Sequence, residues 1–144
     1  DIPEGAVIGI PNDPSNGARA LLVLADKGFI ELKDKNSVTA TTADITKNPK
    51  KYKIQELDAA SIPKAMPDMD IAVINANYAL VAKLNPAKDS LLIERPDNPF
   101  LNIFVTTKAN ANDPRIAQLK KIYQSAENKK FIEEHFKGTI TAGF

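Results

Sequence analysis

Short apolar runs alternate with stretches of helical periodicity along this chain of 144 residues, and that alternation constrains the fold more than any other feature. Residues 6–10 form an apolar run closed by Pro11, and a short run bounded by turn residues predicts a buried strand. After a segment rich in capping side chains, the apolar residues from Ala18 to Ala25 recur with helical spacing. We therefore expect a strand followed by a helix that ends at Gly28.

The same alternation continues through the rest of the chain. Residues 52–57 alternate apolar with polar side chains, as a half-exposed strand does, and residues 71–74 predict a second buried strand. Shorter apolar runs predict strands at residues 91–93 and 101–105. Helices are expected at residues 59–66, at residues 79–84, and in two amphipathic stretches near the end, marked by Ile116, Leu119 and Tyr123 and by Phe131, Ile132 and Phe136.

This order of elements predicts an α/β fold with a mostly parallel sheet flanked by helices and joined by right-handed crossovers. In open parallel sheets, ligands bind beyond the carboxyl ends of the strands. Two polar segments, residues 12–19 and residues 75–78, each directly follow a predicted strand. Both segments therefore lie where a ligand is expected to bind.

Composition argues against several classes of function. The 19 basic and 18 acidic residues nearly cancel and are scattered along the chain, which argues against nucleic acid or an anionic membrane as a partner. The chain has no cysteine and a single histidine, His135, so thiol catalysis and cysteine or histidine metal sites are not expected. We expect His135 to lie on the flank of the last helix.

Length and motif criteria add to this. No apolar run reaches the length of a membrane-spanning helix, and no secretion signal opens the sequence. The chain also lacks the glycine-rich motifs that bind phosphate groups. No motif in the sequence indicates a cofactor or a metal, and we expect none.

Arg19 lies in the first turn of the first predicted helix. A helix start offers N–H groups and a positive dipole, and a guanidinium binds a carboxylate through two parallel hydrogen bonds. One interpretation is therefore that Arg19 recognises a ligand carboxylate. The alternative is a solvated side chain or an ion pair with Asp13 or Asp26, because a cation is unfavourable near a helix start.

Three asparagines are further candidates. Asn75 and Asn77 directly follow the second buried strand, and an amide can both donate and accept, as the two charged ends of an amino acid require. The alternative is a role in the turn or in capping the next helix. Asn102 interrupts an apolar run, so its side chain either binds a partner or faces solvent.

Several linked segments resemble the methionine-binding lipoprotein family, the substrate-binding proteins of methionine ABC importers, and occur in the family's order. They are residues 10–22, 44–45 with 48–50, 56–60, 72–79, 84–89 and 98–102. The resemblance covers the chain from about residue 6 to residue 138.

The resemblance implies one lobe of a type II periplasmic-binding-protein-like fold, followed by C-terminal helices. It implies an extracytoplasmic protein of the cell envelope, lipid-anchored in its full form, which is not an enzyme. Such a protein captures methionine, or a closely related amino acid or methionine dipeptide, and delivers it to the permease of an ABC importer.

The resemblance also implies roles for individual residues. In the family, the arginine that matches Arg19 holds the ligand carboxylate, and asparagines that match Asn75 and Asn102 hold the other polar atoms of the amino acid. Tyr78 matches a position near the binding cleft. These four are the ligand-binding residues that we expect.

The chain departs from the family at its front. Family members begin with a lipidated cysteine and a first lobe whose aromatic residues and histidine wrap the thioether, and no such segment precedes Asp1. We therefore expect a fragment that lacks the N-terminal lobe. Residues 1–107 are expected to form the ligand-binding α/β lobe, and residues 108–144 to form helices that pack on the first lobe of the same protein or of a swapped copy.

Two other classes of function remain as alternatives. A ligand-sensing effector domain of a transcription regulator has the same architecture, because one fold serves many functions. An α/β enzyme with an unrecognised site is the second alternative. Methionine should stabilise a binding lobe without product formation, whereas an enzyme should convert its substrate.

Overall fold

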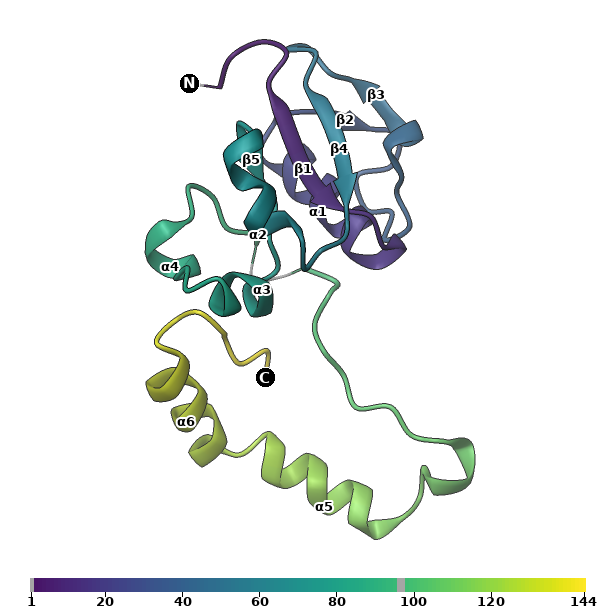
Figure 1. The fold of residues 1–144 in the computed structure, drawn as a ribbon. Helices are drawn as coiled ribbons and strands as arrows, with labels where there is room; N and C mark the ends of the chain where they lie inside the picture. The colour runs from purple at the N-terminus through teal and green to yellow at the C-terminus, as the bar shows by residue number, and fades with distance from the viewer. Residues whose placement is uncertain (1, 96–97) are drawn as a thin grey trace. The chain divides into compact units, whose positions relative to one another are not determined.

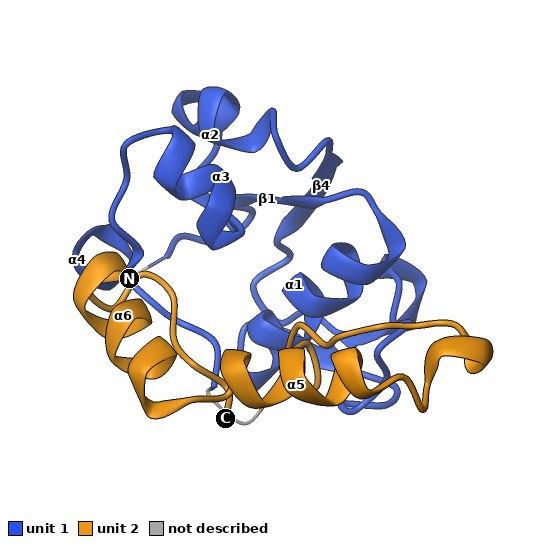
Figure 2. Ribbon diagram, turned by 90° about the horizontal axis from the view of Figure 1, so that it is seen from below, with its two compact units in different colours: residues 1–95 blue, residues 96–144 orange. Residues whose placement is uncertain are grey.

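The computed structural model describes residues 2–95 and 98–144 and contains a mixture of strands and helices (Figure 1). The chain divides into two compact units, residues 1–95 and residues 96–144, which Figure 2 colours separately. Compactness thus groups residues 98–107 with the C-terminal helices. The expected functional division after residue 107 stays a prediction.

A parallel sheet of three strands, in the order β4-β1-β5, forms the centre of the first unit. The central strand β1 (Val7–Pro11) pairs along its whole length with β4 (Lys53–Leu57). The expectations of strands at residues 6–10 and 52–57 are therefore confirmed, within one residue at the ends. The edge strand β5 (Ile71–Ala72) pairs with two residues of β1, and its side chains are half-buried. The expected buried strand at residues 71–74 is confirmed as a strand at residues 71–72 only, and its expected burial is wrong, because both of its side chains are half-buried.

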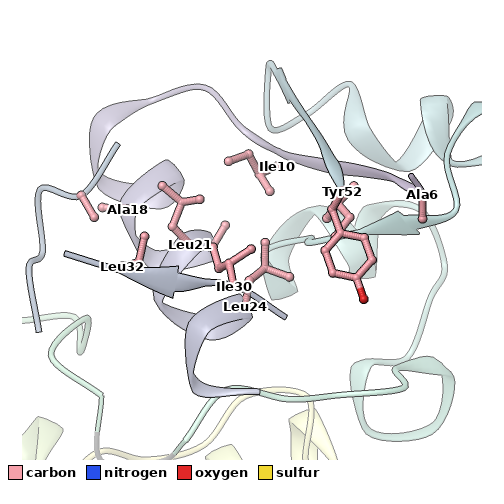
Figure 3. Close-up of a cluster of buried hydrophobic side chains, with 11 residues drawn as sticks. Ala6, Ile10, Ala18, Leu21, Leu24, Ile30, Leu32 and Tyr52 are labelled. Carbon is pink, nitrogen blue, oxygen red and sulfur yellow. The ribbon is translucent and has the colours of Figure 1, made fainter. Parts of the chain in front are cut away.

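Helix α1 (Pro14–Asp26) lies behind β1 and β4 in the view of Figure 1. It packs on one face of the sheet, and side chains of the helix, of β1 and of the segments around them form the core shown in Figure 3. That core contains Ala6, Ile8, Ile10, Ala18, Ala20, Leu21, Leu24, Ile30, Leu32, Ala40 and Tyr52. Gly28, with φ of 78°, adopts the left-handed conformation just beyond α1, as expected for the end of this helix.

The remaining elements of the first unit are short. The strands β2 (Glu31–Leu32) and β3 (Ile45–Lys47) pair antiparallel in a second, separate sheet. The helices α2 (Ile62–Ala65) and α3 (Ala76–Val81) lie near the predicted helices, and α4 (Pro86–Asp89) was not predicted. The described residues also form the 3₁₀ turns η1 (Thr42–Asp44) and η2 (Met66–Asp68) and, in the second unit, η3 (Lys108–Asn110).

Residues 91–93 and 101–105 form no strand, so both of these expectations are wrong. A strand needs a neighbour to pair its backbone groups, and no strand of the described residues pairs with either segment. Their side chains are accordingly exposed, with Leu91 at 90% and Val105 at 84%. The apolar runs are present without a surface that buries them.

The second unit contains α5 (Pro114–Tyr123) and α6 (Ala126–Phe136), which confirm the two predicted amphipathic helices. Ile132 of α6 is buried, whereas Leu119, Ile122 and Phe131 of the apolar faces remain exposed. The last helix ends at Phe136, and its C-cap residue Lys137 adopts the left-handed conformation directly before Gly138. These helices therefore form as the sequence predicts but leave much of their apolar surface uncovered.

Candidate functional site

The two polar segments predicted to follow strands meet at the carboxyl end of the parallel sheet. β1 leads into the start of α1, and β5 leads through residues 73–74 to Asn75 at the start of α3. The side chains of Asn75 and Asn16 join the two starts, since Nδ2 of Asn75 donates to Oδ1 of Asn16 at 2.7 Å. This is the edge at which open parallel sheets bind ligands.

Asp13 holds Asn16 in place. The backbone N–H of Asn16 donates to Oδ1 of Asp13 at 3.0 Å and thereby caps α1. The side-chain Nδ2 of Asn16 donates to both carboxylate oxygens, at 3.0 and 3.1 Å. The backbone hydrogen bond from Asn16 is the largest influence that holds the pKa of Asp13 below its ordinary value of 3.8. Asp13 is therefore a carboxylate at neutral pH and accepts every one of these bonds.

Asn75 occupies the N-cap position of α3, but its side chain makes no capping hydrogen bond to the described residues of that helix. Its Oδ1 is buried and has no hydrogen-bond partner among the described residues. A buried acceptor without a partner costs about 1–3 kcal/mol and is uncommon in native proteins. Asn75 thus holds the cap position through its backbone, and its side chain carries an acceptor that a donor can satisfy.

Arg19 lies three positions after Asn16 on α1, and residues at that spacing share a helix face. Its Nε donates to Oε2 of Glu94 at 2.7 Å, and its second terminal nitrogen contacts Oε1. The two side chains are 30% and 26% exposed. Arg19 thus forms an ion pair with Glu94 among the described residues. The alternative interpretation correctly predicted an ion pair for Arg19 but named Asp13 or Asp26 as the partner.

The other expected residues lie in different surroundings. Tyr78 is partly buried on α3, and its backbone N–H donates to the backbone oxygen of Asn75 at 3.0 Å, whereas Asn77 is exposed. Asn102 is exposed in the second unit, in a segment that is not a strand. The structure therefore brings Asn75 to the start of α1, the helix that carries Arg19, and places Tyr78 in the first turn of the helix that follows Asn75.

Three polar residues of this region were not predicted as members of the site: Asp13, Asn16 and Glu94. For Asp13 and Asn16 a signal exists, because an N-cap aspartate three positions before an asparagine is the spacing at which the two side chains meet at a helix start. No comparable signal exists for Glu94, which is 75 positions from Arg19 in the chain.

The described residues contain no group of three or more His, Cys, Asp or Glu side chains placed to hold a metal ion. Within the same part of the chain, no helix is long and apolar enough to cross a membrane. His135 is exposed near the end of α6 and stacks on Phe131, with ring centroids 5.1 Å apart. That confirms its expected place on the flank of the last helix.

Comparison with known proteins matches the chain over its full length. Residues 1–144 match the family described as NlpA lipoprotein. The D-methionine-binding lipoprotein MetQ of Salmonella typhi is 38% identical over 146 aligned residues, which cover 100% of this chain and 54% of that protein. The chain thus spans about half the length of the curated relatives it matches.

Solved structures agree with this match. A nutrient binding protein from Burkholderia cenocepacia bound to methionine has a TM-score of 0.90 and 46% identity, over 100% of this chain and 61% of that one. An ABC transporter periplasmic substrate-binding protein from Coxiella burnetii has a TM-score of 0.87 and 42% identity, over 97% and 59%. These likenesses confirm the expected lobe of a periplasmic-binding-protein-like fold, and with the match over all 144 residues they show that the chain belongs to the NlpA lipoprotein family.

Proposed function

We propose that this chain is the part of an extracytoplasmic substrate-binding protein that holds the polar end of methionine, or of a closely related amino acid or methionine dipeptide, for an ABC importer. The proposal is carried by the polar face of Arg19, Asn16 and Asn75 beyond the carboxyl ends of β1 and β5. A substrate-binding protein binds its ligand and releases it unchanged, so it is not an enzyme.

The relatives support the identity of the ligand and the partner. The Salmonella relative is named for D-methionine binding, and the Burkholderia structure holds methionine. The Coxiella structure is described as a periplasmic component of an ABC transporter. The word lipoprotein in the names of the relatives supports a lipid anchor in the cell envelope, outside the cytoplasm.

The chemistry of the polar face fits an amino acid. The paired contacts from Arg19 to Glu94 show that this guanidinium takes up a carboxylate in the two-point geometry that such groups favour. We assign it to the ligand carboxylate. The buried Oδ1 of Asn75 suits the ligand ammonium, which only donates. Asn102 and Tyr78 are assigned to further polar contacts and to the rim of the site, on the family resemblance.

We also propose that a first lobe completes the pocket around the ligand side chain. The chain covers only 54% of the Salmonella protein and 61% of the Burkholderia structure. Apolar side chains of residues 101–105 and of α5 and α6 are exposed, which suits a surface that another lobe covers. That lobe belongs to the same protein or to a swapped copy.

The test is titration calorimetry on the full-length protein with L-methionine, D-methionine, methionine dipeptides and, as a control, an amino acid with a charged side chain. We expect saturable binding of at least one methionine compound, no product by mass spectrometry, and weaker binding of the control. Failure of every methionine compound to bind would contradict the proposed ligand. Turnover of a bound compound would contradict the proposed class of function.

A further inference from the structure

We propose that Asp13 and Asn16 are positioning residues that fix which end of the Asn75 amide faces the ligand. Through them, the oxygen of Asn75 and not its nitrogen is presented to the ligand ammonium. This inference rests on the proposed function, because it takes an amino acid as the ligand, and it adds a source of specificity to the site.

The series of contacts begins with a group that can only accept. The Asp13 carboxylate receives the backbone N–H and the side-chain Nδ2 of Asn16, at 3.0 to 3.1 Å. An amide has one donating and one accepting end. Because its Nδ2 is turned to Asp13, Asn16 must turn its Oδ1 away from that carboxylate.

The second contact transmits this orientation across the sheet edge. Oδ1 of Asn16 lies 2.7 Å from the amide nitrogen of Asn75. If the Asn75 amide were flipped, two oxygens would face each other at hydrogen-bond distance and repel. Asn75 therefore has to donate to Asn16. The carboxylate of Asp13 thus fixes the orientation of the Asn75 amide indirectly, through the side chain of Asn16.

The remaining end of Asn75 is then the acceptor. Its Oδ1 is buried and without a partner among the described residues. A ligand with an ammonium group satisfies this oxygen, whereas a ligand without one leaves it buried and unpaired. The three side chains together thus favour amino acids over carboxylic acids of the same shape.

The experiment compares two ligands in the full-length protein. Methionine carries the ammonium, and 4-(methylthio)butanoate has the same carboxylate and thioether without it. The first variant is Asp13→Asn, because asparagine caps a helix as well as aspartate does but can also donate, and so leaves the Asn16 amide free to turn. We expect methionine affinity to fall about tenfold, the effect of one hydrogen bond to a charged group. The affinity for 4-(methylthio)butanoate should change less than about twofold.

Three further variants separate positioning from a purely structural effect. Asp13→Asn combined with Asn16→Asp moves the carboxylate next to Asn75, where it again only accepts, and should restore the preference for methionine. In an Asn75→Ala background, Asp13→Asn should have no further effect on methionine affinity. The control Asp113→Asn makes the same change at the Asp-Pro start of α5, where Asp113 also caps a helix, and should leave binding unchanged.

The outcomes distinguish this inference from the proposed function. Wild-type protein that binds methionine, with Asp13→Asn binding it equally well, overturns the positioning role and leaves the proposed function standing. Equal losses for both ligands, or no rescue by the double variant, also overturn it, because they indicate general damage to the start of α1. Wild-type protein that binds no amino acid overturns the proposed function and this inference together.

Discussion

The ion pair between Arg19 and Glu94 is the residue-scale feature that most affects how the site can be tested. Replacement of Arg19 removes the ion pair and the proposed partner of the ligand carboxylate at the same time. Replacement of Glu94 by glutamine removes the charge pairing but keeps the guanidinium. The two substitutions together separate a structural role of Arg19 from a binding role.

We expect Arg19→Ala in the full-length protein to weaken methionine binding at least tenfold, because hydrogen bonds to charged groups contribute about 1.5–3 kcal/mol. Calorimetry measures this directly. Glu94→Gln should weaken binding less than Arg19→Ala does, and Arg115→Ala, at the first turn of α5, should have no effect. Unchanged affinity in Arg19→Ala, or an equal loss in Glu94→Gln, would show that Arg19 is structural.

The pKa of Asp13 gives a pH-dependent prediction. The folded chain lowers this pKa below 3.8, so folding favours the carboxylate over the protonated acid. The stabilisation from Asp13 is therefore present above its unfolded pKa and is lost as the pH falls through the lower folded pKa. We expect the free energy of unfolding at neutral pH to be larger for wild type than for Asp13→Asn, because asparagine keeps the cap but lacks the charge at the helix start, and this difference should shrink as the pH falls below 3.8.

Denaturant titrations at about pH 6 and about pH 3 measure that difference. A difference that stays constant or grows on acidification would mean that Asp13 does not contribute as a carboxylate.

At the scale of single residues, the sequence predicts the segments that meet, because a polar stretch after an apolar run is a local pattern. It does not predict Glu94 as the partner of Arg19, because that contact joins distant parts of the chain.

At the scale of elements, the close approach of α1 to the end of β1 determines the shape of the site. Gly17, in the first turns of α1, is buried, and a Cβ added there would lie 2.9 Å from the backbone oxygen of Pro11. Pro11 belongs to the central strand and is held by its pairing with β4. The lack of a side chain at Gly17 thus lets the helix start so close to the strand that Asn16 reaches Asn75.

Gly17→Ala should therefore lower the free energy of unfolding by about 1–3 kcal/mol, as overpacking in a core does. The sign of this change in the free energy of unfolding is informative, because replacing glycine by alanine at an ordinary helix position raises the free energy of unfolding by about 1 kcal/mol. Ser15→Ala, at an exposed position of the same turn, is the matched control and should have little effect. Urea denaturation followed by circular dichroism measures both, and a stabilised Gly17→Ala variant would contradict the close approach.

Prediction succeeded for the helices, whose periodicity is local, and for β1 and β4, which pair with each other, and it failed for the apolar runs at residues 91–93 and 101–105. The residues of α1 show their periodicity locally, and β1 is followed at once by the helix that covers it. Residues 91–93 and 101–105 have equally apolar side chains, but an apolar run shows only that a segment can be buried. The sequence of the run does not show whether a neighbouring strand is available to pair with it.

At the scale of the whole molecule, the chain resembles its relatives over its own full length but covers about half of theirs. The order of motifs was sufficient to predict the family and the fold class. It was not sufficient to predict which side chains select the ligand, because the polar groups of the candidate site are the ones that we propose for the amino-acid end. Selection among methionine compounds is the task that we propose for the first lobe.

We expect this chain by itself to show no micromolar binding of methionine, because only one side of the proposed pocket is present. The full-length protein, measured side by side, should bind it. Titration calorimetry on both proteins checks this, with circular dichroism to establish that the isolated chain is folded. Micromolar or tighter binding by the folded chain alone would contradict the proposal that a first lobe completes the pocket.

The register of the central sheet also affects how such a chain has to be made. Val7 of β1 lies opposite Lys53 of β4, with α1, β2 and β3 between them in the sequence. During synthesis, β1 therefore leaves the ribosome well before either of the strands that pair with it. Its Ile8 and Ile10, fully buried in the finished sheet, stay exposed during that interval. Such delayed pairing slows folding and exposes a strand to aggregation, so we expect β1 to benefit from chaperone protection until β4 and β5 are available.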